Sequence, residues 1–135
     1  MPSKTFAAVL LFYMAAFPSH AASPLIDKYQ VSCIAADSTT AGMTNCTYGA
    51  YALWDKELNI TYKNLMSSLS PSEQQALRNS QRQWIAFRDA EFKAIDAMYK
   101  NKDGTMYIPM RAADRLEILK TRVLQLQGYR TLTDG

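Results

Sequence analysis

The strongest constraint on the fold is an apolar stripe of helical period in the middle of the chain. From about Thr40, apolar side chains recur mostly at steps of three or four residues over about seven turns. No segment shows the alternating pattern of a β-strand, so the sequence predicts an all-α fold. The stripe consists of Met43, Cys46, Ala50, Leu53, Trp54, Leu58, Tyr62, Leu65 and Leu69.

A second helix is predicted to begin after Ser70. Ser70 is a suitable cap, Pro71 suits the first helical position, and Glu73 completes a capping box. The helix should run to about Lys100 and end in the turn at residues 101–104. Its stripe consists of Leu77, Gln81, Trp84, Arg88, Phe92, Ile95 and Tyr99.

A third helix is predicted to open at Pro109 and to stop at Gly128. With 135 residues, the chain suits one domain. We therefore expect a small antiparallel bundle of three main helices over residues 39–130. Residues 22–38, which include Pro24, are predicted to form an extended, weakly ordered lead-in.

The N-terminus has the layout of a secretory signal peptide. A positive start with Lys4 precedes the apolar run from Phe6 to Phe17. The helix-breaking Pro18 then comes before small residues that suit cleavage after Ala21 or Ala22. The alternative is a membrane anchor, but twelve helical residues span only about 18 Å of a hydrocarbon core of about 30 Å. Residues 1–21 are therefore predicted to be removed, leaving an exported protein without a membrane anchor.

Cys33 and Cys46 are the only cysteines, an even number in a chain predicted to be exported. An oxidising compartment favours a disulfide between them, which would stabilise the fold by roughly 3 kcal/mol. The alternative is a redox or metal-binding pair, but that would require a closer spacing or further ligands. We expect one structural disulfide near the N-terminus.

The residues after the leader exclude several classes of function. The one histidine, His20, lies in the predicted leader, which removes the common nucleophile pairs and zinc sites. Asp55 and Asp89 could be proposed as a glycosidase pair, but neighbouring arginines favour charged carboxylates, whereas a general acid must hold a proton. Without Lys4, 14 basic residues face 12 acidic ones, too small an excess to indicate nucleic acid. The sequence thus predicts a protein that is not an enzyme and has no metal or cofactor.

Polar residues interrupt the apolar stripes of the first two helices. If these helices pack antiparallel around residue 70, Asp55 and Asn59 face Arg88 and Gln81, with Tyr62 and Trp84 beside them. Buried polar groups need partners, so we expect Asp55 to accept from Arg88 and Asn59 to exchange hydrogen bonds with Gln81. One interpretation is a ligand-binding or catalytic patch, and the other, which we favour, is a buried network that fixes the helix register.

The polar residues of the first two helices, together with the two cysteines and the apolar residues around them, resemble the LprI-type lysozyme inhibitor N-terminal domain family. The resemblance implies a small, exported, helical bacterial protein, and one lipoprotein branch of the family inhibits lysozyme. The Gly104-Thr105 turn and Arg122 also fit. The residues that carry the resemblance are Cys33, Thr40, Met43, Cys46, Asp55, Leu58, Asn59, Tyr62, Leu77, Gln81, Arg82, Trp84, Ile85, Phe87, Arg88 and Asp89.

The chain departs from this family in two ways. Many members carry a second cysteine pair, and the corresponding positions here are Phe92 and Asp114. The last helix is therefore expected to be held by packing alone. The lipoprotein cysteine is absent too.

The resemblance implies a periplasmic or secreted protein that binds a protein partner such as a lysozyme. The alternative is a periplasmic adaptor or immunity-type protein with another partner. The candidate contact lies in the apolar loop 104–110, at Thr105, Met106, Tyr107 and Ile108. The other interpretation of this loop is that its apolar residues cover the open end of the bundle.

Overall fold

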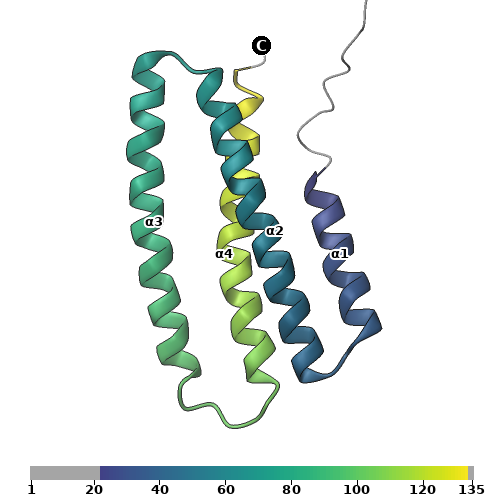
Figure 1. The fold of residues 1–135 in the computed structure, drawn as a ribbon. Helices are drawn as coiled ribbons and strands as arrows, with labels where there is room; N and C mark the ends of the chain where they lie inside the picture. Colours follow the sequence, from purple (N-terminus) through teal and green to yellow (C-terminus); the bar gives the residue numbers. More distant parts are fainter. Residues whose placement is uncertain (1–21, 134–135) are drawn as a thin grey trace, which may run out of the picture.

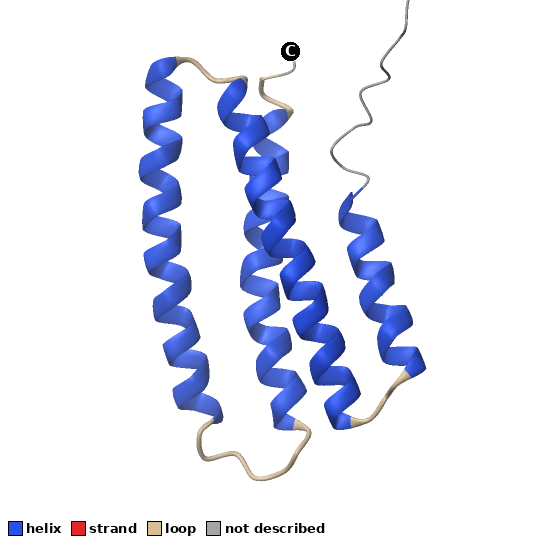
Figure 2. Ribbon diagram, in the orientation of Figure 1, coloured by secondary structure: helices blue, strands red, loops and turns tan. Residues whose placement is uncertain are grey.

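The computed structural model describes residues 22–133, which form four helices joined by short connections (Figure 1). The helices are α1 (Ala22–Ala36), α2 (Thr40–Ser67), α3 (Pro71–Tyr99) and α4 (Tyr107–Arg130). Within the described range the chain contains no strand, as Figure 2 shows. The all-α prediction is confirmed, with four helices in place of the expected three. The predicted signal peptide lies outside the described residues.

The prediction of an extended lead-in was wrong, because residues 22–36 form α1. Pro24 lies in the first turn of this helix, where the missing N–H removes no internal hydrogen bond. Ile26 is buried in the core, and the predicted disulfide between Cys33 and Cys46 joins α1 to α2 with a Cα–Cα distance of 5.7 Å. Contacts with α2 therefore stabilise a helix whose own sequence pattern is weak.

The second helix begins as predicted. The Ser70 N–H donates to Glu73 Oε2 at 2.8 Å, and the Glu73 N–H donates to Ser70 Oγ at 3.4 Å, which completes the capping box. Gly104, in the turn after α3, has a φ of 112° that favours glycine.

The bounds predicted for the last helix were wrong at both ends. α4 begins at Tyr107, two residues before Pro109, and continues past Gly128 to Arg130. Gly128 does not have the positive φ that a glycine stop uses.

The core lies mainly between α1, α2 and α4, and α3 contributes Leu77 to it. α2 packs most extensively on α4 and then on α1, whereas the main contacts of α3 are with α4. Only Leu77 and Ile95 of the 29-residue α3 are buried. The third helix therefore lies on the outside of a unit formed by the other three. The buried core cluster is Ile26, Ala50, Trp54, Leu58, Leu65, Leu77, Leu116, Leu119, Val123 and Leu126.

Replacing either of two glycines with alanine should change the free energy of unfolding, but in opposite directions. A Cβ on Gly42 would lie 2.5 Å from the Asp37 carbonyl oxygen, so Gly42→Ala should lower the free energy of unfolding by about 1–3 kcal/mol. A Cβ on Gly128 meets no atom within 4 Å, so Gly128→Ala should raise it by about 0.4–1 kcal/mol. Urea unfolding of both variants measures the difference. A Gly42→Ala variant as stable as the parent would contradict the close packing of residue 37 on α2.

Candidate functional site

Trp84 and Arg88 of the predicted network belong to a series of cation–π contacts that runs along α3 and reaches α4 through Arg115 and Arg122. The Arg122 guanidinium lies 5.8 Å from the centroid of Trp84, and that of Arg88 lies 5.5 Å from Trp84 and 5.9 Å from Phe92. The Arg115 guanidinium lies 5.1 Å from the centroid of Phe92. Each such contact contributes roughly 0.5–1 kcal/mol when partly exposed. Cations and aromatic rings thus form part of the α3–α4 interface.

The hydrogen bonds predicted between α2 and α3 are not formed. Arg88 Nε and Nη2 donate to Oδ1 of Asp89, its neighbour in sequence, at 2.9 and 2.7 Å. Asn59 Nδ2 donates at 2.9 Å to the backbone carbonyl oxygen of Asp55, in its own helix. Gln81 accepts from α4 instead. These predictions were wrong because α3 packs mainly on α4, which leaves the facing polar groups of α2 and α3 too far apart to pair.

Arg122 is a buried cation with neutral partners. It is only 4% exposed, and it donates to Gln81 Oε1 at 3.0 Å, to Gln125 Oε1 at 2.6 Å and to Ser80 Oγ at 3.1 Å. Within the described range, no carboxylate lies within 4.0 Å of it. Burial lowers the pKa of Arg122 from its usual value. The α3–α4 interface therefore depends on amide and hydroxyl oxygens to hold this charge.

Four of the predicted network residues line a groove between α2 and α3. This α2–α3 groove has a volume of about 600 Å³. Asp55 is half-buried on α2, one turn before Asn59, whereas Trp84 and Arg88 belong to the cation–π series and Asp89 pairs with Arg88. The structure thus distributes the predicted cluster between two sides of α3. The residues that line the groove are Leu58, Asn59, Tyr62, Gln75, Arg78, Gln81, Arg82 and Ile85.

The candidate partner loop forms the tip of the α3–α4 hairpin, and we call residues 104–110 the α3–α4 tip. Thr105 and Met106 precede α4, and Tyr107 and Ile108 begin it. Met106 is 55% exposed and Ile108 is 48% exposed, so about half of each side chain faces solvent. Tyr107 packs edge-on against Tyr99, with 6.2 Å between the ring centroids. The tip therefore presents apolar side chains to solvent on a supported turn.

Phe92 and Asp114, the positions of the absent cysteine pair, have other contacts. The Phe92 ring lies against the Arg88 and Arg115 guanidiniums, and Asp114 Oδ2 accepts a hydrogen bond from the Tyr99 hydroxyl at 2.6 Å. Arg115 also forms an ion pair with Asp96 of α3. The expectation that packing alone holds the last helix was wrong, because polar and cation–π contacts join its first half to α3.

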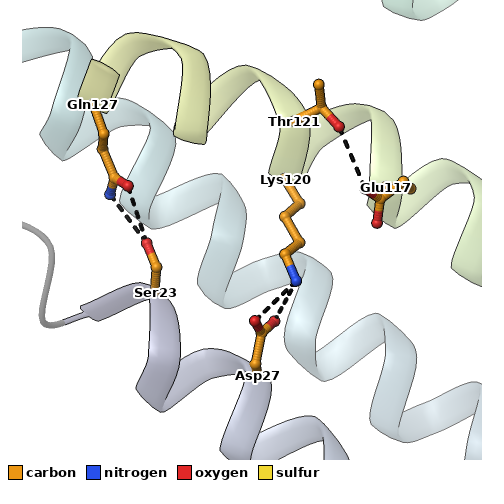
Figure 3. Close-up of polar contacts among 6 residues, drawn as sticks. All are labelled: Ser23, Asp27, Glu117, Lys120, Thr121 and Gln127. Atoms are coloured by element: carbon orange, nitrogen blue, oxygen red, sulfur yellow. Dashed lines mark hydrogen bonds and ion pairs between the residues drawn. The ribbon is translucent and has the colours of Figure 1, made fainter. Parts of the chain in front are cut away.

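A polar cluster that ties α1 to α4 was missed. Lys120 Nζ donates to both carboxylate oxygens of Asp27 at 2.8 Å, and Gln127 exchanges hydrogen bonds with Ser23 at 3.1 and 3.2 Å. Figure 3 shows both contacts. Gln127 Nε2 also donates to the buried Glu57 at 3.3 Å. These partners could be recognised only if residues 22–36 had been read as a helix.

Residues 22–133 contain no group of three or more His, Cys, Asp or Glu side chains placed to hold a metal ion. Among the described helices, none is long and apolar enough to cross a membrane. The two cysteines are both in the disulfide, so neither provides a thiol.

The chain is similar to known proteins over most of its length. The sequence model of the family described as Lysozyme inhibitor LprI matches residues 33–126. A crystal structure of an uncharacterised protein from Burkholderia thailandensis superposes with a TM-score of 0.75 at 31% identity. The match covers 81% of this chain but only 55% of that protein. No curated protein matches the chain. The family match extends over more than half of the sequence, and the chain belongs to the LprI lysozyme inhibitor family.

Proposed function

We propose that the protein is an exported, non-enzymatic binding protein that inhibits a lysozyme. The observation that carries this proposal is the family match over residues 33–126, which includes both cysteines and all of α2 and α3. The leader predicted from residues 1–21 supports a periplasmic or secreted location. The disulfide fits an oxidising compartment.

The α3–α4 tip is the contact that we propose. Lysozymes cleave a glycan between two carboxyl groups, so an inhibitor must fill a cleft that contains negative charge. The tip bears exposed Met106, Ile108 and Met110. Lys102 and Arg111 line a small hollow beside them, and Arg111 lies 3.8 Å from Asp96 of α3. Apolar anchors and adjacent cations match the walls and the carboxylates of such a cleft.

The tip can be tested with the double variant Met106→Glu/Ile108→Glu. It should weaken inhibition at least about tenfold, because two apolar anchors become carboxylates that the cleft repels. The measurement is a muramidase assay in which the oxidised protein, without residues 1–21, is titrated against lysozymes of several classes. The melting temperature should change little, because both side chains are about half exposed.

The matched control is Leu25→Glu/Val31→Glu, which places the same charges at exposed apolar positions of α1. This control should inhibit as the parent does. Equal inhibition by the tip variant and the parent would remove the tip from the contact. Absence of inhibition by the parent at high micromolar concentration, against every lysozyme class, would overturn the proposed function.

A further inference from the structure

The α2–α3 groove lies at the opposite end of the molecule from the tip. Its lining on α3 extends from Gln75 to Ile85, close to the turn that follows α2, whereas the tip joins the other end of α3 to α4 (Figure 1). A partner in the groove would therefore leave the tip free. The proposed inhibition gives the groove no role.

The groove combines an apolar floor with polar walls. Leu58 and Tyr62 of α2 and the partly exposed Ile85 of α3 supply the apolar surface. Its volume of about 600 Å³ lies within the range of ligand-binding pockets. The stretch of α3 that lines it is about 15 Å long at 1.5 Å per residue.

The charge in the groove is positive and has no counter-charge. Arg78 and Arg82 lie one turn apart on α3, about 6 Å along the helix, and their hydrogen bonds are to the neutral side chains of Gln75 and Asn79. Among the described residues, neither arginine has a carboxylate within 4.0 Å, and no Asp or Glu lines the groove. By contrast, Arg88 of the same helix is paired with Asp89.

We propose that the α2–α3 groove binds an acidic amphipathic helix of a protein partner. Acidic residues at positions i and i+4 of a helix are also about 6 Å apart, so two carboxylates can reach Arg78 and Arg82 together. The apolar face of the same helix would contact Leu58, Tyr62 and Ile85, as helices do in apolar grooves. Arginines bind carboxylates with two parallel hydrogen bonds, which fixes the register.

The probe is a fluorescein-labelled helical peptide of about 14 residues that spans the groove. It carries leucines at steps of three and four and two glutamates at i and i+4 beside the leucine face. Its matched peptide has glutamine at the two glutamate positions. Fluorescence anisotropy should show saturable binding of the glutamate peptide, and the glutamine peptide should bind at least about tenfold more weakly. Binding should weaken with salt, because part of it is electrostatic.

The variant Arg78→Gln/Arg82→Gln should weaken binding of the glutamate peptide by at least about tenfold. The control Lys28→Gln/Lys93→Gln removes the same charge from exposed positions outside the groove and should bind as the parent does. Melting temperature and lysozyme inhibition should be unchanged in the arginine variant, which separates this site from the tip. Equal affinity for both peptides, equal binding by the arginine variant, or self-association of the chain through the groove would overturn the proposal.

Discussion

Loss of the Cys33–Cys46 disulfide should lower the free energy of unfolding by about 3 kcal/mol. The bond closes a loop between residues 13 apart in sequence, so it restricts the unfolded chain. It also attaches α1 to α2, and the other contacts of α1 include those of the buried Ile26 and the polar contacts of Ser23 and Asp27. Without the bond, α1 should separate from α2 before the rest of the fold unfolds.

The measurement compares urea unfolding of the oxidised parent with that of Cys33→Ser/Cys46→Ser. The serine variant should also show a melting temperature lower by roughly 10 °C. Dithiothreitol should destabilise the parent by a similar amount and leave the serine variant unaffected, which controls for effects of the serines. Equal stability of parent and variant would mean that the disulfide does not stabilise the fold and that the other contacts of α1 hold it in place.

The two long helices could be predicted because their local signals agree. The capping residues Ser70, Pro71 and Glu73 mark a boundary between two stripes of helical period, and the structure begins α3 at that boundary. The disulfide followed from an even cysteine pair in a chain with an apparent leader. The family resemblance was also confirmed, since the family match covers the motif residues of α2 and α3.

The helix α1 could not be predicted from its pattern. Its amphipathic character is weak, with Ser23 and Ile26 buried while Leu25 and Val31 are exposed. Such a segment is helical because α2 and α4 supply partners for it. The contact between Lys120 and Asp27 spans 93 residues, and nothing local in the sequence indicates it.

The sequence identified the polar residues that α2 and α3 carry near the groove, but the hydrogen-bond partners predicted for them were wrong. The antiparallel register around residue 70 predicted Asn59 level with Gln81, and both residues line the α2–α3 groove. The predicted hydrogen bonds required α2 and α3 to pack tightly together. In the structure α3 packs mainly on α4, and Gln81 accepts from Arg122 across that interface. Register is set locally, but the choice of packing partner depends on the whole chain.

The two tryptophans should have unequal effects on stability. Trp54 is 0% exposed at the centre of the core, and Trp54→Ala should lower the free energy of unfolding by about 3–5 kcal/mol through the cavity that it leaves. Trp84 is half-buried in the cation–π series, and Trp84→Ala should cost only about 1–2 kcal/mol. The difference arises because α3 lies outside the unit formed by α1, α2 and α4.

Urea unfolding measures both values, and hydrogen exchange locates the effect. In Trp84→Ala, amides of α3 should exchange faster while those of the buried stretches of α2 and α4 stay protected. In Trp54→Ala, protection should fall in all four helices. The variant Trp84→Phe is the control, because it retains a ring for Arg88 and Arg122 and should restore most of the protection of α3. If Trp84→Ala costs as much as Trp54→Ala and opens every helix, α3 is part of the core. The α2–α3 groove would then be rigid, since its α3 wall could open only when the whole fold does.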